Sequence, residues 1–177
     1  MAHGSQQSFC ESMSCRYPGR FNGCKVLEIG SLNVNGTVRD FFKGCDYTGV
    51  DIVEGKDVDV VSLCHELEYE DGSFDTIISA ECFEHDPFIK ESLSNILRML
   101  KVGGLFVFTC GTTGRPEHGT IRSTGPSEIY GPDSTYYKNL VEADFRSISG
   151  WDEMFPAGIF TIQSNDIYFC GVKELNN

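Results

Sequence analysis

The sequence predicts an α/β fold: a doubly wound, mostly parallel sheet of seven strands that closes with an antiparallel C-terminal hairpin. Short apolar segments with strand composition alternate with helical segments, a pattern that favours a parallel sheet with helices packed on its faces. Residues 87–101 carry one apolar stripe at the helical period. The last two strand-like segments are separated only by Ser164-Asn165, and such a short connection is typical of an antiparallel hairpin.

The strand-like segments are short and are bounded by glycines, acids or polar turns. They span residues 25–30, 46–52, 58–62, 74–80, 105–110, 158–163 and 166–173. The connection between the second and third segments is far shorter than the dozen or more residues that a parallel crossover usually needs. We therefore expect the third strand to be short or to be reached by an unusual loop.

The clearest helix is expected over residues 87–101, where Pro87 suits the first turn. Its apolar stripe consists of Ile89, Leu93, Ile96, Leu97 and Leu100. Shorter helices are expected over residues 7–17, 37–43 and 135–146. The polar stretch 111–134 is long for a compact domain, and such a loop is usually a lid or a binding loop, or else it is disordered. We assign four phenylalanines to the core: Phe41, Phe42, Phe106 and Phe108.

The length and the net charge of the chain limit the classes of function that it can have. Residues 1–5 look like a cloning remnant, and residues 6–177 fit one domain with a sizeable core. The net charge is −12, with 26 acidic and 14 basic residues, whereas proteins that bind phosphate polymers usually carry a basic footprint. Nucleic-acid and anionic-membrane partners are therefore not expected, and no apolar run reaches the roughly 20 residues of a bilayer span. Nothing in the sequence indicates the oligomeric state.

The eight cysteines suggest a reducing compartment. The chain has no recognisable signal peptide, and half of its cysteines lie in or beside strand-like segments, so buried free thiols in the cytoplasm fit better than disulfides. No Cys-x-x-Cys pair is present, which leaves a structural zinc site without support. The cysteines are Cys10, Cys15, Cys24, Cys45, Cys64, Cys82, Cys110 and Cys170.

Two strand ends resemble a nucleotide-type site. The first strand delivers Glu28 and Gly30, and a loop that starts at Ser31 follows; glycine lets a ligand approach the backbone closely. The second strand ends at Asp51, about 20 residues further on, at the spacing of an acid that accepts hydrogen bonds from ribose hydroxyls. Ile52 would then lie beside the adenine as an apolar wall. A helix cap or a loop acid is the alternative role for Asp51.

Several segments, in order, resemble the class I S-adenosylmethionine-dependent methyltransferases of the type that carries Leu-Glu-His after the fourth strand, here Phe83-Glu84-His85. The similarity covers residues 25–110 and is carried by Val26–Gly30, Tyr47–Asp51, Glu70–Asp75 and Leu97–Phe106. It implies a Rossmann-like fold, methyltransferase activity and S-adenosyl-L-methionine as cofactor. Cys110–Thr120 also resembles an uncharacterised subgroup found near surface-sugar genes, which names no substrate.

The resemblance implies roles for residues at the strand ends. Glu28 would orient the methionine amino group, directly or through water, and Asp51 would hold the ribose. Leu63 and Cys64 would contact the adenine, partly through backbone, and Glu81 and Cys82 would face the methionine part.

Three positions depart from the family's pattern. Leu32 and Val34 occupy or neighbour the places of its later glycines, and Leu63 stands where an acid is common. Adenine recognition is therefore expected to rest on backbone groups.

The methyl acceptor is expected beyond the cofactor. His85 follows the fourth strand and is either a general base or a cap of the next helix. Arg115 and His118 either bind the acceptor or lie in a solvated loop, and Tyr136 and Tyr137 line the pocket or pack in the core. A metal held by His85, Glu117 and His118 is not expected, because nothing sets their spacing.

Two other functions compete with methyl transfer to a small molecule such as a sugar or another metabolite. A non-catalytic module could keep the fold for binding only, although Gly30 and Asp51 favour a working cofactor site. A nicotinamide-dependent oxidoreductase is disfavoured, because the spacing Gly-x-Gly-x-x-Gly is missing.

Overall fold

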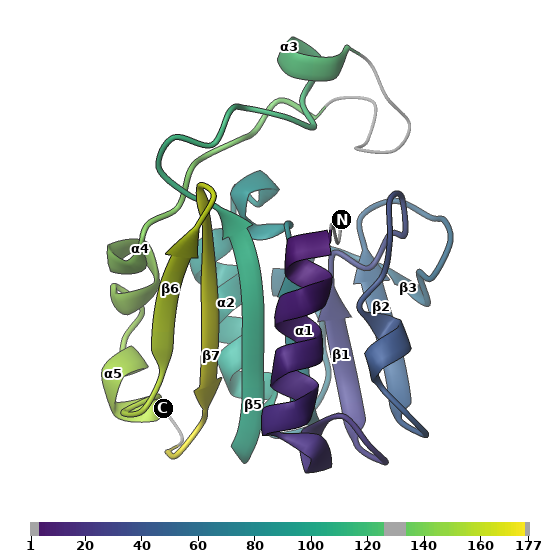
Figure 1. Ribbon diagram of the computed structural model, residues 1–177, viewed down its shortest axis with the longest axis vertical. Helices are drawn as coiled ribbons and strands as arrows, with labels where there is room; N and C mark the ends of the chain where they lie inside the picture. The colour runs from purple at the N-terminus through teal and green to yellow at the C-terminus, as the bar shows by residue number, and fades with distance from the viewer. Residues whose placement is uncertain (1–3, 126–133, 176–177) are drawn as a thin grey trace.

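The computed structural model describes residues 4–125 and 134–175. Its strands form one mixed sheet of seven strands in the order β3-β2-β1-β4-β5-β7-β6 (Figure 1). The first five strands are parallel, and β7 runs antiparallel to both β5 and β6. The predicted fold class is confirmed. The strands are β1 (Lys25–Ile29), β2 (Asp46–Asp51), β3 (Val60–Val61), β4 (Phe74–Ala80), β5 (Leu100–Gly111), β6 (Ile159–Gln163) and β7 (Asp166–Val172).

Helices cover both faces of the sheet, with α1 on one face and α2 on the other, while α4 and α5 lie beside the β6 edge (Figure 1). The helices are α1 (Gly4–Arg16), α2 (Ile89–Met99), α3 (Ile121–Thr124), α4 (Glu142–Arg146) and α5 (Trp151–Met154). Short 3₁₀ turns are η1 (Pro18–Arg20), η2 (Arg39–Phe41), η3 (Cys64–Glu66) and η4 (Phe83–His85). Of the predicted remnant, residues 1–3 lie outside the described residues, and Gly4 and Ser5 form the start of α1.

Two predicted helices are largely wrong. Residues 37–43 contain only the turn η2, because Gly36 and Gly44 with positive φ bracket a segment too short for an α-helix. Residues 134–141 have no regular structure, and α4 begins only at Glu142. Their backbone groups bond elsewhere: the Lys138 amide donates to the Glu84 carbonyl and the Leu140 amide to the Gly111 carbonyl. These tertiary hydrogen bonds replace the helical ones.

The short connection between β2 and β3 is made without a helix. The Val58 amide donates to the Gly55 carbonyl in a tight turn, and the Asp59 amide donates back to the Gly49 carbonyl of β2. Only Val60 and Val61 then pair with β2. The expectation of a short third strand is confirmed, because a chain this short can place only two residues beside its neighbour.

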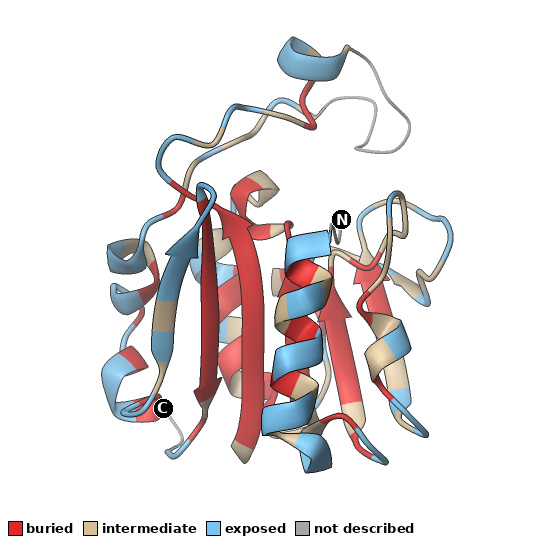
Figure 2. Ribbon diagram, viewed as in Figure 1, coloured by how far each residue is buried: buried red, intermediate tan, exposed pale blue. Residues whose placement is uncertain are grey.

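The core has two layers, one on each face of the sheet. Alternate residues of β5 point to opposite faces: Phe106 and Phe108 join the cluster that includes the α2 stripe, whereas Leu105 and Val107 join the cluster under α1. Figure 2 shows β5 and β7 buried and the edge strand β6 largely exposed. Phe42 is also buried, while Phe41 is only partly so. Among the described residues, no helix has the length and apolarity to cross a bilayer.

Candidate active site

A cleft opens at the carboxyl ends of the parallel strands. The chain order reverses between β1 and β4, and ligands bind at such a switch point in doubly wound folds. The cleft encloses about 940 Å³, counting its open mouth. Its walls come from the ends of β1, β2 and β4, from the η3 turn, and from Gly119 and Ser134 of the long connection that carries α3 above the sheet (Figure 1).

The turn after β1 forms one wall of this cleft. The amides of Gly30 and Ser31 both donate to the Val50 carbonyl of β2, at 2.8 and 3.0 Å. Gly30 has φ +81°, and a Cβ atom built on it would lie 2.5 Å from Cβ of Cys82. Only glycine fits this turn, because it supplies both the positive φ and the close approach.

Asp51 closes the neighbouring strand and lines the same cleft. Its Oδ2 accepts a hydrogen bond from the Leu32 amide at 3.0 Å, and its Oδ1 accepts one from the Val53 amide at 3.2 Å. Burial raises the pKa of Asp51, although these hydrogen bonds act in the opposite direction. Ile52 beside it is 56% exposed, which leaves an apolar side chain open to a ligand at this wall.

Glu28 and Ser31 lie beneath the turn and not among the residues that line the cleft. Glu28 is buried, and its Oε2 accepts a hydrogen bond from the Tyr47 hydroxyl at 2.8 Å. Burial raises the pKa of Glu28 to about 7, against the effect of the Tyr47 hydrogen bond. Direct contact between Glu28 and a ligand is therefore not supported by this geometry.

The raised pKa of Glu28 makes stability depend on pH. The folded state holds this proton up to about pH 7, while the unfolded chain releases it near pH 4.5, so stability falls as pH rises through this window. Between pH 5 and 8 we expect wild-type protein to lose about 2–3 kcal/mol more than Glu28→Gln, given 1.36 kcal/mol per pKa unit. Urea unfolding of both proteins across this range measures the difference, and parallel curves would contradict the prediction.

Three buried acids, Glu81, Glu84 and Asp166, lie at or behind the end of β4, and of these Glu81 lines the cleft. Arg115 lies between two of them, with its guanidinium 3.7 Å from Oε2 of Glu81 and 3.3 Å from Oδ1 of Asp166. Glu84 instead accepts a hydrogen bond from the Gly111 amide at 3.1 Å. Burial and the nearby Glu81 raise the pKa of Glu84 well above its ordinary value, and the same two causes raise the pKa of Asp166 to about 6.

Three rings gather next to these carboxylates. The His85 ring centroid lies 5.0 Å from that of His118 and 5.4 Å from that of Tyr137. Burial, with a smaller contribution from His118, lowers the pKa of His85 to about 4, so its imidazole is neutral at pH 7. His85 lines the cleft and does not cap α2, which begins at Ile89 after Phe88 with no side-chain cap.

Part of the chain is similar to known proteins. Residues 27–108, just under half of the chain, match the methyltransferase domain family. A sarcosine/dimethylglycine N-methyltransferase of Halorhodospira halochloris is 34% identical over 97 residues, which are 54% of this chain and 33% of that protein. Over about half of its length, the chain is therefore similar to methyltransferases. It spans about a third of the length of this curated relative.

Solved methyltransferase structures share the fold of this chain. The 1,6-didemethyltoxoflavin-N1-methyltransferase of Burkholderia thailandensis, with its namesake compound and S-adenosylhomocysteine bound, aligns with TM-score 0.64 and 17% identity, over 96% of this chain and 78% of that one. Phosphoethanolamine N-methyltransferase 2 of Haemonchus contortus, in complex with S-adenosyl-L-methionine, aligns with TM-score 0.64 and 17% identity, over 95% and 53%. These two structures thus hold S-adenosyl-L-methionine or its demethylated product.

The predicted site residues of the chain fall into two groups. Those that line the cleft are Gly30, Asp51, Ile52, Leu63, Cys64, Glu81, Cys82 and His85. The others lie behind or beside its walls: Glu28 and Ser31 under the β1 turn, and Arg115, His118, Tyr136 and Tyr137 around the buried carboxylates. The backbone carbonyl of Tyr136 accepts a hydrogen bond from the His85 ring. The predicted pocket loop extends over residues 126–133, which lie outside the described residues.

The sequence interpretation missed two buried acids of the site, Glu84 and Asp166. Glu84 directly precedes His85, and an acid next to a candidate catalytic histidine was a usable indication. Asp166 follows a hairpin turn at the far end of the chain, and nothing local marks it. The sequence analysis considered Glu117, and not Glu84, as a metal ligand beside His85 and His118. Glu117 is exposed, and its Oε1 lies 2.9 Å from Nη2 of Arg122.

Proposed function

We propose that this chain transfers the methyl group of S-adenosyl-L-methionine to a small-molecule acceptor in the cleft. One observation carries the proposal: the glycine turn and Asp51 line the same cleft as Glu81 and His85. Two of the similar proteins are named for small methyl acceptors, sarcosine or dimethylglycine and 1,6-didemethyltoxoflavin. The cleft can take the cofactor along the β1–β2 side and the acceptor toward the loop.

On the cofactor side, Asp51 would accept hydrogen bonds from the ribose hydroxyls through lone pairs that Leu32 and Val53 do not use. Ile52 and Leu63 would hold the adenine between apolar surfaces. Glu81 and Cys82 would face the methionine part from the end of β4. Glu28 would act only through the turn above it, because it lies beneath that turn.

On the acceptor side, methyl transfer is an in-line displacement: the acceptor atom bonds to the methyl carbon while the carbon–sulfur bond breaks, and S-adenosylhomocysteine leaves. Alignment and proximity supply much of the rate for such a step. The neutral imidazole of His85 would accept a hydrogen bond from the acceptor's O–H or N–H group and orient its lone pair. We place the enzyme in the cytoplasm, in keeping with its eight free cysteines.

Asp51→Asn should weaken cofactor binding by roughly 1.5–3 kcal/mol, the range for a hydrogen bond to a charged group. The amide keeps the size of the side chain and one of its acceptor oxygens. Asp46→Asn is the matched control, because Asp46 is exposed at the other end of the same strand. Calorimetric titration with S-adenosylhomocysteine measures both variants. An equal affinity for wild type and Asp51→Asn would place the ribose elsewhere.

The same titration separates the competing functions. Wild-type protein should bind S-adenosyl-L-methionine and should gain thermal stability from it, because a ligand stabilises the folded state that it binds. Nicotinamide cofactors should leave the melting temperature unchanged. If S-adenosyl-L-methionine neither releases heat nor shifts the melting temperature, the proposed function is overturned and a module without cofactor is favoured.

A further inference from the structure

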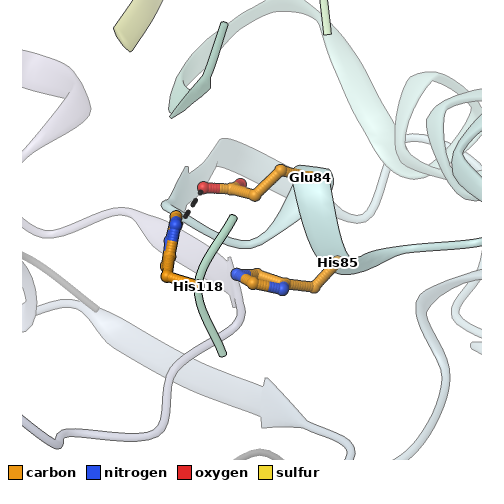
Figure 3. A group of neighbouring side chains, drawn as sticks. All are labelled: Glu84, His85 and His118. Atoms are coloured by element: carbon orange, nitrogen blue, oxygen red, sulfur yellow. Dashed lines mark ion pairs between the residues drawn. The ribbon is translucent and has the colours of Figure 1, made fainter. Parts of the chain in front are cut away.

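Glu84, His85 and His118 converge on one point beside the cleft (Figure 3). Each offers one ligand atom, and the three atoms lie within 4.8 Å of one another. Glu84 and His85 come from the η4 turn after β4, and His118 comes from the loop after β5. Two imidazole nitrogens and one carboxylate oxygen suit several divalent transition-metal ions, and three protein ligands leave coordination positions open.

Glu84 supplies an independent indication that a cation belongs here. The residue is fully buried, and its Oε2 has no hydrogen-bond partner among the described residues. A buried carboxylate oxygen without a partner is costly. The guanidinium of Arg115 pairs with Glu81 and Asp166, so it does not compensate the third buried acid.

His118 is oriented as metal-binding histidines usually are. Its Nδ1 lies 3.1 Å from the Pro116 carbonyl oxygen, and its Nε2 lies 3.8 Å from Oε1 of Glu84. A proton on Nδ1 would bond to that carbonyl and leave the Nε2 lone pair directed at the cluster. Histidine ligands commonly donate their other ring N–H to a backbone carbonyl, which sets the tautomer.

We propose that Glu84, His85 and His118 bind a divalent transition-metal ion at the acceptor end of the cleft. Tetrahedral ligand atoms bound at about 2.1 Å lie about 3.4 Å apart, so the three ligand atoms, now within 4.8 Å of one another, must close by up to about 1.4 Å. Because His85 lines the cleft, an open coordination position there would take an oxygen of the acceptor, provided that the proposed function holds. This bond to the ion would replace the direct hydrogen bond between the acceptor and His85. A bound ion would orient that oxygen and polarise it.

The test is a titration of the chelator-treated, metal-free chain with Co²⁺, followed by visible absorption and by calorimetry. We expect one saturating ion per chain. Glu84→Gln and His118→Ala should each weaken binding at least about tenfold. Glu117→Gln is the matched control, since this acid lies in the same loop but pairs with Arg122, and its affinity should equal that of wild type. The spectrum of bound Co²⁺ should change when acetohydroxamate, an oxygen-donor probe, is added.

Glu84→Gln alters a buried residue and can disturb the fold, whereas His118→Ala changes only a loop residue and keeps Glu84. Circular dichroism checks that each variant is folded. Absence of saturable Co²⁺ binding, or an equal loss in Glu117→Gln, would overturn the site. If acetohydroxamate leaves the Co²⁺ spectrum unchanged, the bound ion has no open coordination position, and that part of the proposal is wrong. S-adenosylhomocysteine titrated into the same metal-free samples tests the proposed function separately: its binding without Co²⁺ binding overturns the metal site alone.

Discussion

Gly30→Ala should lower the free energy of unfolding by about 3 kcal/mol, from roughly 1–2 kcal/mol for the positive φ and 1–3 kcal/mol for overpacking. The new Cβ would meet Cβ and Sγ of Cys82 at 2.5 and 2.7 Å. Both partners line the cleft, so the strand ends that would hold the cofactor must move apart. We therefore expect S-adenosylhomocysteine binding to be lost together with stability. Urea unfolding and calorimetry measure the two effects.

Gly44→Ala is the control that separates the cost of the positive φ angle from the cost of the contact with Cys82. Gly44 has φ +61°, but nothing lies within 4 Å of a Cβ built on it, so it should lose only about 1 kcal/mol. Cys82→Gly in the Gly30→Ala background removes the clashing atoms and should restore part of the stability. If Gly30→Ala and Gly44→Ala cost the same, close approach to Cys82 does not contribute.

Arg115→Met should lower the free energy of unfolding at pH 8 by about 2–3 kcal/mol. This loss is at or below the low end of the range for breaking a buried ion pair, because the Arg115 side chain is 25% exposed. The substitution leaves Glu81 and Asp166 without a cation, although they are only 2% and 3% exposed. The cost should shrink toward pH 5, since the pKa of Asp166 is raised to about 6 and its proton removes the charge that Arg115 compensates. Unfolding at both pH values measures this.

Two companion variants identify the cause. Arg122→Met breaks the exposed pair with Glu117 in the same loop, and exposed pairs contribute little to stability, so no measurable change is expected. Asp166→Asn in the Arg115→Met background removes one of the unpaired charges and should recover stability at pH 8. Equal losses for Arg115→Met and Arg122→Met would show that the buried carboxylates do not need Arg115.

Local patterns were sufficient for most elements of the fold. The apolar stripe of α2 and the two-residue turn at Ser164-Asn165 each depend on neighbours a few residues away, and both predictions hold. The helix predicted over residues 135–146 fails for the opposite reason. Backbone amides in its first half donate hydrogen bonds to the carbonyls of Glu84 and Gly111. These partners are distant in sequence, so local helix propensity cannot predict them.

The same distinction separates the parts of the site. The sequence alone was sufficient to predict that Gly30 and Asp51 share one cleft, because they end neighbouring parallel strands, and strand order places such ends together. Only the tertiary structure decided the cluster on the side proposed for the acceptor: it buried Glu84 against Gly111, brought His118 of the loop to His85, and set Arg115 between Glu81 and Asp166. These contacts depend on how a long loop folds back over the sheet, and the free energy that selects this path comes from burial and charge pairing between segments far apart in the chain.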